Sequence, residues 1–384
     1  MRRRTFLAAG CAWCAATLPR QVLAQSAPWT PPARFARPDI ASDEGGLWAL
    51  MDREETKLRR SRFVLRDRQL HDYIQDIVCR LAGEHCPDVR VHLVHTPYFN
   101  ASMAPNGMMQ VWTGLMLRVD NEAQLAAVLG HEIGHYMARH SIEQLREAKS
   151  RSGVASFMAL FGVAGLVGQM GLVASMYSYT RDHEREADRI GAVLMRKAGY
   201  DVGEAAKVWE NLLLELKARG DDAEKTSPLF ATHPPAAERQ DALTALAKEL
   251  PGGVTNAAAW IAHTKPYLRE WLDDEVKRGQ HEESLALLTR LMARSPDQPE
   301  YAFARGEVHR LRARNDDLDA AVTDYKVAVK LGGEPPEVYR GLGNIYRLRA
   351  KAAEAKASFQ HYLDLAPNAP DAPMIKSYLE ELHT

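Results

Sequence analysis

The sequence predicts an α+β fold that is mostly α-helical, in which a domain with a small antiparallel sheet is followed by an α-solenoid. Three observations carry this prediction: helical periodicity in two long stretches, a short region of alternating apolar residues between them, and an internal repeat in the last third. With 384 residues the chain is long enough for two or three domains, and its 46% hydrophobic and 26% charged residues suit packed cores. A net charge of −1 argues against nucleic-acid binding by bulk charge.

The first 24 residues have the pattern of an export signal. Three arginines at positions 2–4 precede the apolar run 6–18, and small residues before Gln25 suit a signal peptidase. We predict a signal peptide over 1–24, cleaved after Ala24, and a proline-rich linker over 25–42. The arginines and the residues after them resemble a twin-arginine signal, which would export an already folded chain. Lipidation at Cys11 is disfavoured because the apolar run before it is short.

Helices and then a sheet are predicted at the start of the first domain. Apolar residues near helical spacing predict helix over 43–82, with Gly83 as its stop. The period then changes to two, which predicts strands, and a turn-forming tripeptide predicts a hairpin. The predicted strands are 89–93, 98–104 and 108–112, and the last two are joined through Pro105-Asn106-Gly107. We therefore expect a small antiparallel sheet.

Two further helices are predicted after the sheet. Asn121 and Gln124 stand at capping-box spacing, and no proline or polar break interrupts the helix pattern before Glu147. We therefore predict one continuous helix up to that residue. The second helix is predicted from about Arg181 to Ala198, where Gly199 follows as a stop signal.

An uncharged stretch separates these two helices. Residues 154–177 are 24 in number, which is enough to span a bilayer. Glycine recurs at every third position from 162 to 171, and Gln169 interrupts the apolar run. These features favour closely packed helices beside a site, so a membrane span is disfavoured, while membrane association through this stretch stays open.

Residues 265–384 are predicted to form tetratricopeptide repeats. Small and aromatic residues recur at the spacing of this repeat. In it, small residues let two helices cross closely, and aromatic rings fill the groove between them. The last unit shows the pattern most clearly, Ala321 and Tyr325 belong to the unit before it, and a first unit is degenerate. The matching positions of the last unit are Tyr339, Leu342, Gly343, Tyr346, Ala355, Phe359 and Pro367. Such a solenoid needs about three helix pairs to bury its core. An ordinary helical bundle is the alternative.

The strongest chemical signal is the pentapeptide His131-Glu132-Ile133-Gly134-His135. At about 100° per residue on a helix, the two histidines lie only ~40° apart and face one point. Neutral imidazoles suit zinc, and a catalytic zinc site has three protein ligands and one open position. Glu132 would stand beside the metal and take a proton from water. A polar helix face is the alternative interpretation.

The third ligand is assigned to the later helix. Glu184 and Asp188 are four residues apart and share one face, with small residues nearby that allow close helix packing. We predict Glu184 as the ligand and Asp188 as the carboxylate that orients a ligand histidine. The alternative is a solvated charged face. His140 and His183 are excluded as ligands because their positions around the helix would direct their side chains away from the site.

Three ordered motifs resemble one family of enzymes. They are His131-Glu132-x-x-His135, Glu184-x-x-x-Asp188, and Thr232-His233-Pro234-Pro235 with Arg239. Together they are similar to the signatures of the HtpX-like and CAAX-prenyl-endopeptidase family of zinc metallopeptidases. The resemblance covers about residues 43–250 and implies a zincin-like metallopeptidase domain, in which Arg239 supports the metal site. The segment from Asn100 and Ala101 to Gly114 resembles the strand pair of the family.

With an export signal before it and repeats after it, the chain resembles the periplasmic, BepA-like branch. This implies one Zn²⁺ per chain on His131, His135 and Glu184, with Glu132 as general base. It also implies a periplasmic endopeptidase acting on unfolded or misassembled envelope proteins in outer-membrane protein assembly and quality control. A substrate would add to the sheet edge at Asn100 and Ala101. The repeats would bind a protein partner, for which the outer-membrane assembly machinery is a candidate.

Two other functions remain open at this stage. One is a non-proteolytic chaperone or assembly scaffold that acts through the repeats. The other is a zinc hydrolase that cuts bonds other than peptides. An intact Glu132 argues against the first, because a structural zinc site has no need of that carboxylate.

His233 precedes a proline, which holds it in extended conformation. Because the resemblance implies that this segment lies near the metal, three roles are open. His233 could stabilise an oxyanion, occupy the fourth zinc position in a latent enzyme, or be structural. We favour the latent ligand.

Cys79 and Cys86 are predicted to form a disulfide. Export leads to an oxidising compartment, and Gly83 allows the chain to turn back between them. Two buried free thiols are the alternative.

Overall fold

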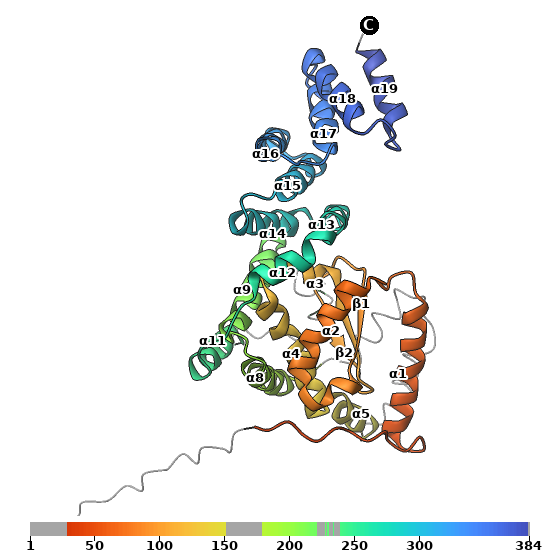
Figure 1. Cartoon of the computed structure of the whole chain (residues 1–384), viewed down its shortest axis with the longest axis vertical. Coiled ribbons are helices and arrows are strands. Elements are labelled where there is room, and N and C mark those ends of the chain that lie inside the picture. The colour runs from red at the N-terminus through yellow and green to blue at the C-terminus, as the bar shows by residue number, and fades with distance from the viewer. Residues whose placement is uncertain are drawn as a thin grey trace, which may run out of the picture. The chain divides into compact units, whose positions relative to one another are not determined.

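The structure of the chain is a computed structural model that describes residues 29–150, 179–220 and 239–382, together with Ser227, Leu229 and His233. The described part is mostly helical and contains one small mixed sheet (Figure 1). The predicted signal peptide, the stretch 154–177 and the motif residues Thr232, Pro234 and Pro235 lie outside the described residues.

The sheet has three strands, β1 (Arg90–Val94), β2 (Ala101–Met103) and β3 (Met108–Trp112), in the order β1-β3-β2. The predicted hairpin is confirmed, since β2 pairs antiparallel with β3 across a turn in which Gly107 has φ 86°. The prediction of a wholly antiparallel sheet was wrong, because β1 runs parallel to β3. β1 skips β2 and pairs with β3, so the two reversals of the chain leave β1 and β3 in the same direction. Alternating residues predict strands but not their partners.

The predicted helical stretch 43–82 is divided in two. Helix α1 (Asp43–Arg60) ends at Ser61, and α2 (Arg68–Ala82) begins where the Asp67 side chain accepts a hydrogen bond from the Leu70 amide at 2.9 Å. Gly83 ends α2 with φ 56°, as predicted. A 3₁₀ turn (Gly83–Asp88) then leads into β1. The Asp67 cap is the local cause of the break, because it starts a new helix rather than continuing α1.

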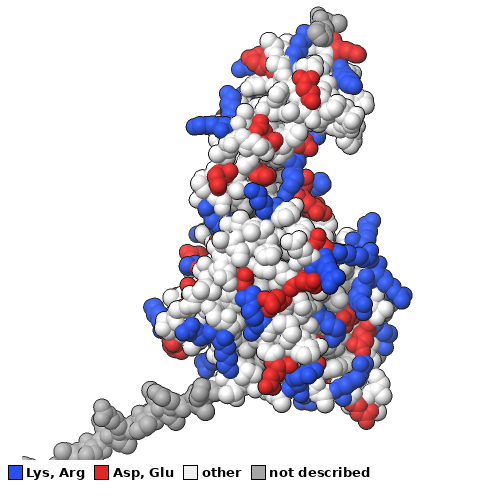
Figure 2. Space-filling view, viewed as in Figure 1, with Lys and Arg blue, Asp and Glu red and all other residues white. Residues whose placement is uncertain are grey.

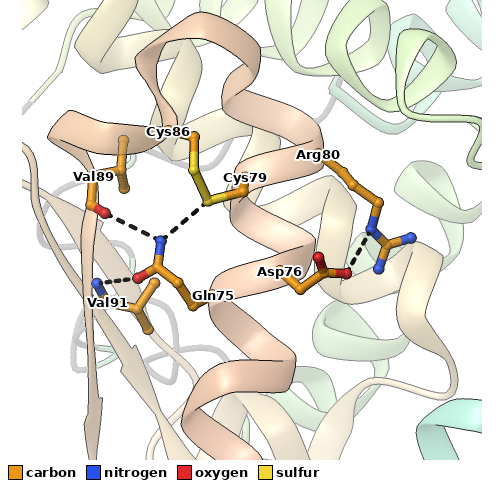
Figure 3. The surroundings of a disulfide bond; sticks show 7 residues. All are labelled: Gln75, Asp76, Cys79, Arg80, Cys86, Val89 and Val91. Atoms are coloured by element: carbon orange, nitrogen blue, oxygen red, sulfur yellow. Dashed lines mark hydrogen bonds and ion pairs between the residues drawn. A yellow bond between two sulfur atoms is a disulfide. The ribbon is translucent and has the colours of Figure 1, made fainter.

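The disulfide joins the end of α2 to this 3₁₀ turn (Figure 3). Cys79 and Cys86 have Cα atoms 4.6 Å apart. Beside them, Gln75 Nε2 donates to Val89 O and Gln75 Oε1 accepts from Val91 N, both at 3.1 Å. The bridge and the glutamine together tie α2 to the first strand.

A short helix, α3 (Thr113–Arg118), follows the sheet and leads to α4 (Glu122–Ala138). The predicted start of α4 is confirmed, because Asn121 Oδ1 accepts from the Gln124 amide at 2.9 Å. The prediction that the helix continues to Glu147 was wrong. It ends at Arg139, which has φ 62°, and α5 (His140–Ser150) begins in a new direction.

Tertiary contacts of Arg139 account for this break. Its guanidinium pairs with Glu44 of α1 and lies 5.2 Å from the centre of the Phe35 ring. These contacts stabilise a left-handed residue that the local sequence does not favour, since arginine carries a Cβ.

Helix α4 crosses α8 (Arg181–Lys197) at close range. A Cβ added to Gly191 would lie 2.9 Å from the His131 amide nitrogen, and one added to Gly134 would lie 2.8 Å from Ala187 O. The small residues predicted to permit this approach therefore lie at the contact itself. The crossing brings the histidines of α4 against the carboxylates of α8.

The remaining helices of the described chain follow α8 in sequence up to the C-terminal α19 (Figure 1). They are α9 (Gly203–Arg219), α11 (Arg239–Glu249), α12 (Ala257–Thr264), the 3₁₀ turn Lys265–Tyr267, α13 (Leu268–Lys277), α14 (His281–Arg294), α15 (Pro299–Arg312), α16 (Asp317–Leu331), α17 (Glu337–Leu348), α18 (Ala352–Leu365) and α19 (Ala372–Glu381). From α14 onward each helix packs against the next. A Cβ on Gly306 or Gly341 would meet the Tyr325 ring, and one on Gly343 would meet Phe359. Glycines therefore make room for buried rings at these crossings.

Buried charges connect α3 to the helices that follow. Arg118 donates to Glu215 Oε2 of α9 at 2.7 Å and to Glu275 Oε2 of α13 at 2.9 Å. All three side chains are buried. On the molecular face shown in Figure 2, by contrast, basic and acidic side chains are interspersed over the surface. None of the helices among the described residues has the length and apolar character needed to cross a bilayer.

Candidate metal centre

Four buried side chains from three parts of the chain converge on one point. His131 and His135 come from α4, Glu184 comes from the first turn of α8, and His233 lies between α9 and α11. One donor atom of each lies within 4.8 Å of every other. The crossing of α4 and α8 thus places the three predicted ligands together. His233, from the segment between α9 and α11, lies beside them.

The spacing of the donor atoms fits a tetrahedral ion. His131 Nε2 lies 3.0 Å from His135 Nε2 and 3.3 Å from His233 Nδ1. Glu184 Oε1 lies 3.0 Å from His233 Nδ1 and 3.3 Å from His135 Nε2. Bonds of 2.0–2.1 Å in tetrahedral geometry place zinc ligands about 3.3 Å apart. Three imidazoles and one carboxylate are also the ligand types that zinc takes, so the residues present fit this ion.

Asp188 and Arg239 support one side of this cluster. Asp188 Oδ1 lies 2.9 Å from His131 Nδ1, which leaves Nε2 of the same ring free to face the other donors. Arg239 donates to Asp188 Oδ2 and to Glu184 Oε2, both at 2.8 Å, and its guanidinium lies 4.0 Å from the centre of the Trp209 ring. The sequence predicts both residues beside the metal ligands, and in the structure both contact the cluster.

His140 supports the other side, which the sequence did not predict. Its Nδ1 lies 2.8 Å from His135 Nδ1, and its Nε2 lies 3.3 Å from Glu186 Oε2. His140 is not one of the four donors, but the angular argument that placed it far from the site was wrong. That argument assumed one continuous helix, whereas the left-handed turn at Arg139 returns His140 to His135. On its other face the His135 ring stacks on Tyr179, with centroids 3.7 Å apart.

The charges of the cluster perturb its acids and bases. Burial raises the pKa of Glu132, which is 3% exposed and whose Oε1 lies 3.3 Å from His233 Nε2. For Glu184, burial acts to raise the pKa, but the charges of His233 and His131 and the bonds from His135 and His233 hold it far below its usual range. Burial also keeps the pKa of His135 well below its usual value, which favours the neutral imidazole that a metal requires.

We expect His140→Ala to weaken zinc binding by about 10- to 100-fold, because His135 loses the partner that fixes its ring. His183→Ala is the matched control, because the His183 ring stacks on His140, with centroids 4.3 Å apart, whereas the atom that lies 2.8 Å from His135 Nδ1 belongs to His140. The measurement is a competition titration against a chromophoric chelator. Equal zinc affinities in the parent and both variants would show that His140 does not support the metal site.

The sheet edge lies near this cluster through α4, which packs against β2. Ala101 opens β2 and is buried, and Asn100 precedes it with its backbone carbonyl accepting from the Trp112 amide at 3.2 Å. The Asn100 Oδ1 atom is buried and has no hydrogen-bond partner among the described residues. Along the described chain, β2 pairs only with β3, and no described strand pairs with its other edge.

Comparison with known proteins agrees with this site. Residues 64–247 match peptidase family M48. A "Putative beta-barrel assembly-enhancing protease" of Vibrio cholerae is 26% identical over 296 residues, which cover 64% of this chain and 60% of that protein. The mitochondrial metalloendopeptidase OMA1 of Arabidopsis thaliana is 33% identical over 153 residues, covering 40% of this chain and 30% of that protein.

A beta-barrel assembly-enhancing protease of Yersinia pestis is 29% identical over 225 residues, which cover 53% of this chain and 45% of that protein. The chain thus matches between about a third and three fifths of the length of these three relatives. The matched region contains both helices that carry the cluster, as well as His233 and Arg239. The family resemblance predicted from the three motifs is confirmed, since residues 64–247 match peptidase family M48.

Proposed function

We propose that this protein is an exported zinc metalloendopeptidase that cuts unfolded or misassembled envelope proteins in the periplasm, as part of outer-membrane protein assembly and quality control. The observation that carries the proposal is a buried carboxylate, Glu132, beside four convergent metal-ligand atoms in a region that matches peptidase family M48. The names of two relatives, which refer to β-barrel assembly, support the biological setting.

The residues around the cluster have distinct parts in peptide hydrolysis. His131, His135 and Glu184 would hold zinc, which when bound supplies a Lewis acid and a more acidic water. Glu132 would accept a proton from the attacking water and return it to the leaving amine. Its raised pKa suits both steps, because a base with a pKa nearer to neutrality also serves as an acid. Asp188 and Arg239 keep His131 and Glu184 oriented.

His233 is proposed as the fourth ligand of a latent form. Its Nδ1 atom lies 3.3 Å from His131 Nε2 and 3.0 Å from Glu184 Oε1, and its Nε2 faces Glu132 at 3.3 Å. A ring in this place would exclude the substrate carbonyl and separate Glu132 from water. Displacement of the ring by a client would open the site.

We expect His233→Ala to raise basal proteolysis, by up to about 10-fold if nine molecules in ten are latent. An oxyanion-stabilising role predicts the opposite, a fall of ~10²-fold or more. Initial rates on unfolded casein, corrected for bound zinc, distinguish these outcomes. An unchanged rate would leave only a structural role for His233.

The substrate is proposed to bind in extended form along the edge of β2 that is not paired with β3, at Asn100 and Ala101. Backbone hydrogen bonds to a strand edge require an accessible main chain, which folded proteins rarely offer. The unpartnered Oδ1 of Asn100 supports this proposal, because it can accept a hydrogen bond from a bound chain.

Helices α13–α19 are proposed to be tetratricopeptide repeats that bind a protein partner, with the outer-membrane assembly machinery as the candidate. Support comes from glycines that meet aromatic rings at successive helix crossings, as that repeat requires. Membrane association through 154–177 and export by a twin-arginine route remain predictions from the sequence.

Digestion of casein with and without chelator, beside Glu132→Gln, tests the proposed function. A metalloendopeptidase gives new peptides that disappear in both controls. A chaperone would suppress aggregation of an unfolded client equally in all three samples without cutting it. A hydrolase of other bonds would give no peptide products in any sample.

A further inference from the structure

A groove with basic walls lies between α8 and α11, beside the metal cluster. The two helices pack side by side (Figure 1), and the cavity between them has a volume of about 270 Å³. Four arginines and three acidic residues line it, together with an apolar strip of α11 that consists of Ala242, Ala245 and Leu246. Clefts for drug-sized ligands begin at about 300 Å³, so this groove suits a smaller, anionic group.

Three of the arginines form a row on α8. Arg181, Arg185 and Arg189 follow one another at four-residue intervals, so they lie on one face of the helix. Arg185 donates to Asp182 at 2.7 Å, but this ion pair is exposed and therefore weak. Among the described residues, neither Arg181 nor Arg189 has a hydrogen-bond or ion-pair partner. The row therefore presents guanidinium groups that are free to bind an anion.

The acidic residues of the groove oppose an anion less than their number suggests. Glu184 and Asp188 each accept from Arg239 at 2.8 Å, so their charges are already compensated. Glu249, at the end of α11, is exposed and has no partner among the described residues. Glu249 is therefore the carboxylate of the lining that would repel a bound anion.

The place of the arginine row in the sequence indicates which anion binds. Arg181 follows the uncharged stretch 154–177 by four residues. Basic residues directly beside an apolar stretch are typical of chains that bind anionic lipid headgroups at a membrane surface. Planar guanidinium groups also match phosphate oxygens, with which they form paired hydrogen bonds. These two features favour a phosphate group over the carboxylate of an acidic peptide.

We propose that the groove between α8 and α11 binds a phosphate group through Arg181, Arg185 and Arg189, supplied by an anionic lipid headgroup or by free phosphate. The apolar strip of α11 would contact the glycerol part of a lipid headgroup. A lipid bound here would bring the metal cluster to a membrane surface, because α8 also carries Glu184. The proposal does not depend on the peptidase activity.

Cosedimentation with vesicles at about 0.15 M salt tests the lipid source. The zinc-loaded mature protein is mixed with vesicles of phosphatidylcholine alone, or with phosphatidylglycerol added. We expect Arg181→Gln combined with Arg189→Gln to weaken binding to the phosphatidylglycerol vesicles by about 10- to 30-fold. Glu249→Gln should strengthen the same binding, because it removes the opposing carboxylate. Binding to phosphatidylcholine alone reports any contribution of other segments.

Arg59→Gln combined with Arg60→Gln is the matched control. Both arginines are exposed on α1 and lie outside the groove, so this variant loses the same charge elsewhere. Its affinity for the phosphatidylglycerol vesicles should stay within about twofold of the parent value. An equal loss in the α1 and α8 double variants would show attraction by bulk charge and would overturn the proposal.

Calorimetric titration with inorganic phosphate tests the second source. Phosphate binding that the α8 double variant loses, without a preference for phosphatidylglycerol vesicles, would support the site and assign it to free phosphate. A preference for those vesicles that the α8 double variant loses would support the site and assign it to lipid. A parent that binds neither probe, or an α8 double variant that binds both as tightly as the parent, would overturn the proposal. Binding of polyglutamate alone would also overturn it, in favour of an acidic peptide.

Discussion

Glu132→Gln is expected to reduce proteolysis by about 10²-fold or more while zinc binding is retained. Glu132 is buried and adjoins the cluster, but it is not one of the four donors. The amide keeps the shape of the side chain and cannot accept the proton of the attacking water. Proteolysis is measured as the initial rate on casein, and zinc binding is measured by metal analysis of the same preparation.

Glu143→Gln is a matched control for this variant. Glu143 lies on α5, where it pairs with His183 at 3.3 Å, and its side chain is 54% exposed. The same substitution there should change neither rate nor zinc content. If Glu132→Gln and Glu143→Gln turn over casein equally well, the assignment of the general base is wrong.

Arg118→Ala is expected to lower the free energy of unfolding by about 3–5 kcal/mol, because it removes the buried cation that two buried carboxylates share and leaves each with fewer partners. Glu275 has no exposed surface and Glu215 is 2% exposed, and both accept from Arg118. Burial acts to lower the pKa of Arg118, but the charges of Glu275 and Glu215 raise it, so the guanidinium is charged in the folded state. Denaturant unfolding followed by circular dichroism gives the change.

Arg68→Ala serves as the control for Arg118→Ala. Arg68 and Asp72 form an exposed pair at 3.3 Å, with side chains 93% and 61% exposed. Exposed ion pairs contribute little to the free energy of unfolding, so the unfolding midpoint of this variant should equal that of the parent. A loss of less than about 1 kcal/mol in Arg118→Ala would show that the remaining partners, Arg290 for Glu215 and Arg278 for Glu275, are sufficient for the two carboxylates.

Features that depend on neighbouring residues were predictable from the sequence. The paired histidines of α4 follow from helical spacing, and the start of α4 follows from the Asn121 side chain. The crossing with α8 follows from small residues such as Gly191. These signals act over one or two turns of chain, where local geometry decides the result.

Features decided by distant contacts were not predictable. The partner of β1 depends on which strand edge it meets, and alternation is the same for either partner. The break at Arg139 depends on Glu44 and Phe35, which precede it by 95 and 104 residues along the chain. His140 was misplaced for this reason. Arg118 has the appearance of an ordinary surface charge in the sequence, because its partners lie on α9 and α13.

Zinc analysis of the purified protein, beside Glu184→Gln, tests the central claim most directly. Glu184 is buried, faces both histidines of α4 and carries a pKa far below its usual range, so it would supply the negative charge of the donor set. We expect one zinc per chain in the parent after metal loading and dialysis, and loss of that zinc in Glu184→Gln. A parent without zinc, or a variant that binds one zinc as tightly as the parent, would contradict the metal centre described here.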